Sequence, residues 1–180
     1  ANTMPAPYYR FDGSDDYIDT GDTFQSTFQN SFSISAMVKL NDGQAATLQT
    51  IFGLYDTTGD AWIQLGILAS GKIRFCYGPA SGAVTLDTAF EYDDGETPWQ
   101  HIVAVGDEVA DTLSVYVNGV LLPTTASTAA LDWTDFATAR YPYIGARNTG
   151  GSVAEEIGGS IQQLGVYNLA LSAAEVKELY

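Results

Sequence analysis

Five aspartates lie within eleven residues near the start of the chain: Asp12, Asp15, Asp16, Asp19 and Asp22. Calcium takes about six to eight oxygen ligands, and carboxylate-rich turns supply them. The spacing differs from that of an EF-hand loop. Two interpretations stay open: a calcium site held by Asp12, Asp15 and Asp16, or a solvated acidic turn in an acidic protein.

A second acidic segment contains Glu91, Asp93 and Glu96. A retaining glycosidase needs two carboxyl groups about 5–5.5 Å apart on a rigid surface, one of them in a setting that raises its pKa. The Asp-Gly and Thr-Pro pairs within and after this segment are typical of a solvated loop. We therefore predict no catalytic residues, and a glycoside hydrolase using Glu91 and Glu96 is the weakest functional alternative.

His101 and Cys76 are the only histidine and the only cysteine. No Ser/His/Asp, Cys/His or zinc arrangement can be assembled from them by spacing. Cys76 lies in a strand-like run, and His101 follows Trp99 at the start of another. We predict structural roles for both residues, and for Trp99 a place in the core.

Sugar recognition uses flat aromatic faces together with planar polar groups that hydrogen-bond to hydroxyls. Aromatic, arginine and amide side chains with these properties occur in or beside predicted strands and in later loops. The candidate ligand-binding residues are Tyr55, Trp62, Arg74, Tyr77, Trp133, Tyr141, Arg147 and Asn148. For each of them, packing in the core or on the surface is the alternative.

Strands must position these side chains. Residues 32–40 alternate with period two, which places Phe32, Ile34, Ala36, Val38 and Leu40 on one face of a half-buried strand. The same reading applies to residues 62–68, 72–77, 101–105, 113–117 and 161–167. Short spacings and the absence of long amphipathic helices predict an all-β fold, a two-sheet antiparallel β-sandwich. Irregular stretches are expected at 42–50, 85–97, 124–139 and 148–159.

The chain ends differently. Ser172 and Glu175 form a Ser-x-x-Glu capping box, which predicts a short C-terminal helix. We predict one domain over residues 1–180, with residues 1–7 as an N-terminal extension. These first residues lack the basic start and apolar core of a signal peptide, so we expect an excised domain.

The net charge limits the classes of partner that the chain can bind. Seven basic residues stand against twenty-two acidic ones, giving a net charge of −15. Such a surface repels nucleic acids and anionic membranes. No apolar run reaches the roughly 20 residues that span a bilayer, so we predict neither nucleic-acid binding nor membrane insertion.

Four segments carry a resemblance to a known family: residues 11–18, 99–105, 113–119 and 159–176. Together they resemble the laminin-G-like and concanavalin A-like lectin/glucanase superfamily. The resemblance implies a jelly roll of two curved antiparallel sheets, commonly a carbohydrate-binding or adhesive module of bacterial, phage or extracellular proteins. It also implies an extracellular or virion-associated location.

The resemblance bears on the possible catalytic residues and on calcium binding. Residues 91–96 fit the Glu-x-Asp-x-x-Glu string that carries the nucleophile and acid/base in related glucanases. Relatives often have Asp-Glu where this chain has Gln162 and Gln163. That Asp can help to hold calcium in related sandwiches, whereas a neutral amide offers one uncharged oxygen, so a calcium site there would be weakened.

The predicted function is a non-catalytic carbohydrate-binding module whose partner is a glycan or polysaccharide. The alternative is a structural or protein-adhesion domain of a virion or surface protein, whose partner is a protein surface. Oligomerisation would serve either function, since repeated weak sites gain avidity.

Overall fold

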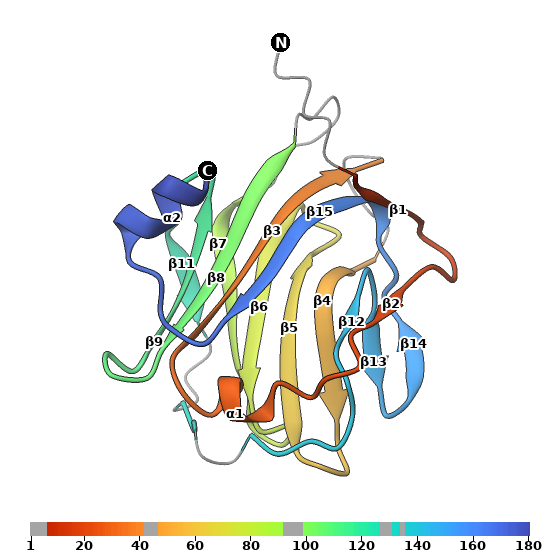
Figure 1. Cartoon of the computed structure of the whole chain (residues 1–180), viewed down its shortest axis with the longest axis horizontal. Helices are drawn as coiled ribbons and strands as arrows, with labels where there is room; N and C mark the ends of the chain where they lie inside the picture. The colour runs from red at the N-terminus through yellow and green to blue at the C-terminus, as the bar shows by residue number, and fades with distance from the viewer. Residues whose placement is uncertain (1–6, 42–46, 92–98, 127–130, 134–135) are drawn as a thin grey trace.

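The computed structural model describes residues 7–41, 47–91, 99–126, 131–133 and 136–180. Its strands form two sheets, with β15, β3 and β8 of one sheet lying across β4, β5 and β6 of the other (Figure 1). Described strand pairs are antiparallel except β13 with β4, which is parallel. The predicted antiparallel β-sandwich is confirmed.

The six-stranded sheet has the order β1-β15-β3-β8-β9-β10. Its strands are β1 (Tyr9–Asp12), β15 (Gly158–Tyr167), β3 (Phe32–Leu40), β8 (Gln100–Asp107), β9 (Thr112–Val117) and β10 (Val120–Leu121). The alternation over residues 32–40 thus predicts β3 with its observed bounds. Residues 101–105, 113–117 and 161–167 also fall within strands of this sheet.

The nine-stranded sheet has the order β11-β7-β6-β5-β4-β12-β2. Its strands are β11 (Thr124–Ala126), β7 (Val84–Glu91), β6 (Lys72–Gly78), β5 (Ala61–Ile67), β4 (Gln49–Asp56), β12 (Tyr143–Ile144) and β2 (Ile18–Asp19). Two further strands extend it: β13 (Arg147–Thr149) pairs with β4, and β14 (Ser152–Ala154) pairs with β13.

Several of these strands lie where the sequence predicts irregular structure. That expectation is wrong for β7, which runs to Glu91, and for β11, β13 and β14. The last three have only three residues each, too few to show a period of two. Strands this short are set by the strands they pair with rather than by their own pattern.

Two helices complete the fold. The C-terminal helix α2 (Ala173–Leu179) begins at the predicted capping box, in which the Glu175 amide donates to Ser172 Oγ and the Ser172 amide donates to Glu175 Oε2. The short helix α1 (Gln25–Phe28), which the sequence analysis did not predict, lies at one end of the sandwich (Figure 1). No helix in the described ranges is long and apolar enough to cross a membrane.

The core between the sheets contains two of the candidate ligand-binding residues. Tyr77 is 0% exposed and Trp133 is 7% exposed, and their rings pack together with centroids 4.8 Å apart. The Tyr77 hydroxyl donates a hydrogen bond to the Phe28 carbonyl. Tyr77 also shares its strand face with the core residues Ile73 and Phe75. Because both candidates are buried, they pack in the core, out of reach of a ligand.

His101 and Cys76 are buried, as structural roles require. His101 Nε2 lies 2.8 Å from Ser35 Oγ, and burial lowers the pKa of its imidazole. Burial raises the pKa of the Cys76 thiol to about 11, which disfavours the reactive thiolate. Trp99, in contrast, is only partly buried and lies outside the core.

Candidate functional site

The outer face of the nine-stranded sheet gathers four of the candidate residues. Apolar side chains such as Leu54 and Ile63 point into the core. Side chains alternate along a strand, so their neighbours Tyr55 and Trp62 point away from it. Arg74 on β6 and Arg147 on β13 lie on the same outer face, as their contacts below show. We call this set, together with Gln64 and Glu155, the outer-face cluster.

Arg147 is the centre of the outer-face cluster. Its Nη2 lies 2.8 Å from Glu155 Oε1, and its Nη1 donates to Gln64 Oε1 at 3.4 Å. The guanidinium carbon lies 5.5 Å from the centre of the Tyr55 ring, within cation–π range. β13 pairs with β4 at Gly53, where an added Cβ would lie 3.4 Å from Arg147 Cβ and Cγ. The same Cβ would lie only 2.7 Å from Thr50 Cγ2, so the glycine makes room for Thr50 beside the arginine.

Gln64 connects the charged and aromatic parts of the cluster. Its Nε2 donates to Glu155 Oε2 at 2.5 Å and to Thr50 Oγ1 at 2.7 Å, while its Oε1 accepts from Trp62 Nε1 at 3.2 Å. The rings of Tyr55 and Trp62 meet edge to face with centroids 5.2 Å apart. Gln64 is fully buried, so these contacts fix the orientation of the tryptophan.

Two buried polar atoms on β13 lack hydrogen-bond partners among the described residues: Arg147 Nε and Thr149 Oγ1. Thr149 is paired with Tyr55 across the β13–β4 ladder, so both atoms flank the Tyr55 side chain. Unpartnered buried polar groups are uncommon in folded proteins. They mark this edge of the cluster as a place where water or a ligand would complete the hydrogen bonding.

Arg74 forms a separate ion pair on the same face. Its Nε and Nη2 donate to the two oxygens of Asp87 at 2.7 and 2.8 Å. This bidentate hydrogen bond is the main cause of the raised pKa of Arg74. Since Arg147 is also paired with Glu155, through Nη2 and Oε1, the face presents planar polar groups with little local excess charge.

The remaining two candidates lie beside the cluster. Asn148 is buried, its amide donates to the Tyr141 carbonyl, and its Oδ1 accepts from the Gly151 amide. It therefore holds the backbone of the β13–β14 turn. Tyr141 is 40% exposed on the preceding loop, and its described hydrogen bond uses the backbone carbonyl rather than the ring.

The sequence analysis missed Gln64, Glu155, Thr50 and Asp87. A signal existed for two of them: Gln64 and Asp87 occupy the polar positions of alternating strands. Glu155 gave no local signal. It reaches Gln64 across 91 positions of sequence, through the parallel pairing of β13 with β4.

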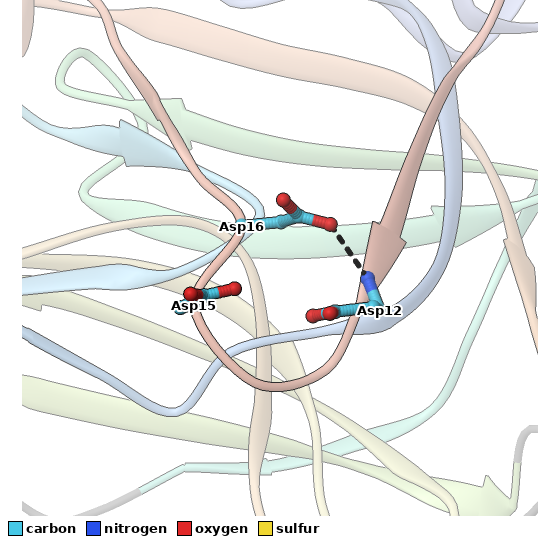
Figure 2. Close-up of side chains that lie close together, drawn as sticks. All are labelled: Asp12, Asp15 and Asp16. Atoms are coloured by element: carbon cyan, nitrogen blue, oxygen red, sulfur yellow. Dashed lines mark hydrogen bonds between the residues drawn. The ribbon is translucent and has the colours of Figure 1, made fainter.

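Asp12, Asp15 and Asp16 converge at the turn after β1 (Figure 2). Each offers one oxygen, and these oxygens lie within 4.8 Å of one another. Oxygens around one calcium, at about 2.3–2.6 Å from it, lie up to about 5 Å apart. Two carboxylates are also bonded within the turn: Asp16 Oδ2 accepts from the Asp12 amide and Asp12 Oδ1 from the Ser14 amide. The donor set fits a hard cation, and calcium binding stays a prediction.

The second acidic segment falls largely outside the described residues. The Glu91 backbone ends β7, whereas Asp93 and Glu96 lie in the range 92–98, which the structure does not describe. The structure therefore adds nothing to the predicted absence of catalysis at this segment.

The sandwich and its outer-face cluster define a lectin-like β-sandwich domain. Residues 12–177 match the family profile described as the concanavalin A-like lectin/glucanases superfamily. The chain belongs to this superfamily, as the resemblance of its four segments implies.

Solved structures similar to this chain include sialidases and a sialidase module. The CBM40 module of the Ruminococcus gnavus IT-sialidase, bound to α2,3 sialyllactose, is 18% identical with a TM-score of 0.75, over 98% of this chain and 96% of that chain. The K499G mutant of NanB sialidase from Streptococcus pneumoniae is 20% identical with a TM-score of 0.70, over 94% of this chain and 27% of that chain. At such identities the likeness shows the fold alone. A search of curated protein sequences found no match.

Proposed function

We propose that the chain is a non-catalytic carbohydrate-binding module whose ligand lies on the outer-face cluster. The observation that carries this proposal is the bonded network of Arg147, Glu155 and Gln64 beside the Tyr55 and Trp62 rings. Aromatic faces beside fixed planar polar groups are what a sugar ring with its hydroxyls requires. The groups are held before any ligand arrives, which lowers the entropic cost of binding.

Binding rather than hydrolysis is the function that this face supports. The carboxylates described on it, Glu155 and Asp87, are each held by an arginine at 2.7–2.8 Å. A retaining glycosidase needs one carboxyl group as acid/base and another as nucleophile. Glu155 and Asp87 instead orient arginines, a role suited to recognition.

The module's place in a larger protein is part of the same proposal. We assign it to an extracellular or virion-associated protein, in which repeated copies would raise avidity for a weakly bound glycan. The CBM40 structures contain α2,3 and α2,6 sialyllactose, so sialylated and neutral forms of lactose are the first ligands to compare.

A glycan-array screen followed by titration calorimetry tests the proposal. We expect selective glycan binding, and we expect Trp62→Ala to weaken it about tenfold, or about 1.4 kcal/mol, through loss of the ring that Gln64 orients. Tyr180→Ala is the matched control, because Tyr180 is an exposed aromatic residue that follows α2, outside the cluster, and we expect the glycan affinity of this variant to be unchanged.

Two results would contradict the proposal in different ways. Wild-type affinity in Trp62→Ala would move the glycan site away from the outer-face cluster. If the folded protein bound no glycan on a broad array, the structural or protein-adhesion alternative would be favoured.

We further propose that Asp12, Asp15 and Asp16 bind calcium. With a dissociation constant of about 0.1–1 mM, typical of extracellular modules, about 10 mM calcium stabilises the fold by roughly 1.4–2.7 kcal/mol. The melting temperature should then rise by roughly 3–10 °C. We expect calorimetry to show this rise in the wild type and in the equally charge-reduced control E156Q/E178Q, but not in D15N/D16N. An equal rise in both variants would mean that calcium binds elsewhere.

A further inference from the structure

A hollow lined by residues of β1, β15 and β3 lies on the six-stranded sheet, away from the outer-face cluster. These three strands run side by side at the upper right of Figure 1. The volume of the hollow is about 300 Å³, at the lower end of the range for small-molecule sites. The polar and aromatic residues that line it are Tyr8, Arg10, Lys39, Asn41, Trp99 and Ser160. We call it the Arg10–Lys39 pocket, and none of these residues belongs to the outer-face cluster.

Strand register brings the two cations together. Arg10 pairs with Ser160, and Ser160 pairs with Lys39, so the three residues form one row across β1, β15 and β3. Neighbouring strands are about 4.8 Å apart, which puts the two cationic residues about 10 Å apart with the small Ser160 between them. Both long side chains can therefore reach one group placed above Ser160.

The charge of this pocket is unusual for the chain. The net charge is −15 with only seven basic residues, yet Arg10 and Lys39 line one hollow. Within the part of the chain that the structure describes, neither residue forms an ion pair, and the pocket lining contains no carboxylate. By contrast, Arg74, Arg140 and Arg147 are each paired with an acid.

The aromatic residues add a shape requirement. The rings of Tyr8 and Trp99 meet at 64° with centroids 5.7 Å apart, forming a corner beside the cations. Tyr8 is 56% exposed and Trp99 is only partly buried, so both leave ring surface open. Exposed aromatic surface in a hollow is typical of a binding site for a ring with an apolar face.

We propose that the Arg10–Lys39 pocket binds a sugar ring that carries an anionic group, a carboxylate or a sulfate. The anion lies between Arg10 and Lys39, where both donate charge-assisted hydrogen bonds. The ring packs against Trp99 and Tyr8, and the Asn41 amide and Ser160 hydroxyl are available to its hydroxyls. This site is independent of the proposed glycan site on the other sheet.

The three tryptophans give the test its resolution, because Trp62 lies on the outer-face cluster, Trp99 in this pocket and Trp133 in the core. Their indole N–H signals can be followed by NMR during titration at low salt with galacturonate, galactose 6-sulfate and galactose, which share one ring configuration. We expect the Trp99 signal to shift with an anionic sugar at about tenfold lower concentration than with galactose. The tighter of the two anionic sugars identifies the charged group.

Charge-matched variants separate the effect of the two cations in the pocket from the effect of the protein's net charge. R10Q/K39Q and K72Q/K177Q each remove two positive charges, and Lys72 and Lys177 lie outside the pocket. We expect the preference for anionic sugars to disappear in R10Q/K39Q and to remain within twofold in K72Q/K177Q. Equal losses in both variants, or a Trp99 signal unmoved by either anionic sugar, would overturn the proposal. Shifts at Trp62 alone would overturn it while leaving the outer-face glycan site in place.

Discussion

Replacing Glu155 by alanine is expected to lower the free energy of unfolding by about 3 kcal/mol. The side chains of Arg147 and Glu155 are only 16% and 23% exposed, so the arginine would be left largely buried without its counter-ion. Removing one partner of a buried ion pair costs about 3–5 kcal/mol, and partial exposure here favours the lower end. Gln64, fully buried, would also lose its 2.5 Å acceptor. Urea unfolding followed by fluorescence measures the loss.

The double variant R147M/E155L shows what the ion pair itself contributes. Replacing both partners by apolar side chains of similar size leaves no charge uncompensated. The buried Gln64 amide still loses its Glu155 acceptor but keeps Thr50 Oγ1, so we expect a loss of about 1–2 kcal/mol. Glu156→Ala is the matched control, since this neighbouring carboxylate forms no ion pair among the described residues. A loss within about 0.5 kcal/mol for Glu155→Ala would show that solvent screens the pair.

The same variants separate stability from recognition. We expect R147M/E155L to fold and yet to lose glycan binding, because the planar polar groups are gone while the sheet stays intact. A folded double variant with wild-type affinity would remove the outer-face cluster from the proposed function.

Local pattern predicts much of this fold. A strand with one buried face must alternate, and the inner positions of β3 are apolar, with Phe32, Ile34 and Val38 fully buried. The serines at its outer positions 33 and 35 are buried too, which the alternation does not predict. The same alternation could have shown which of the two candidates on β6 faces the core and which faces outward. Tyr77 shares the parity of Ile73 and Phe75, which are core residues, whereas Arg74 has the opposite parity. The alternation along β6 therefore indicated that Tyr77 faces the core.

Tertiary contacts decide the rest of the outer-face cluster. Trp133 follows no strand period, and its burial comes from packing against Phe32 and Tyr77, which lie far away in sequence. Glu155 joins the cluster only because β13 and β14 form a hairpin against β4. The Gly150-Gly151 pair is a signal for that hairpin, but no local pattern indicates a parallel partner strand.

Phe28→Ala is expected to have the largest effect on stability, a loss of about 3–5 kcal/mol. Phe28 is fully buried, and its ring contacts those of Phe24, Phe32, Phe52 and Phe136 with centroids 5.0–6.1 Å apart. Removing it leaves a cavity that four stiff aromatic rings cannot easily fill. The melting temperature should fall by roughly 6–20 °C, as measured by calorimetry.

The loss should also be local, because Phe28 is the one residue of α1 that is buried in the core. The helix has four residues and no side-chain cap, and it begins after Phe24 in a left-handed conformation with φ of 50°. We expect faster amide hydrogen exchange over residues 24–30 in Phe28→Ala, with Trp62 and its glycan affinity unchanged at temperatures where the variant is folded. Phe28→Leu, which keeps most of the volume, should lose about 1–2 kcal/mol. Equal losses for alanine and leucine would mean that the aromatic contacts, rather than the filled volume, stabilise this end of the sandwich.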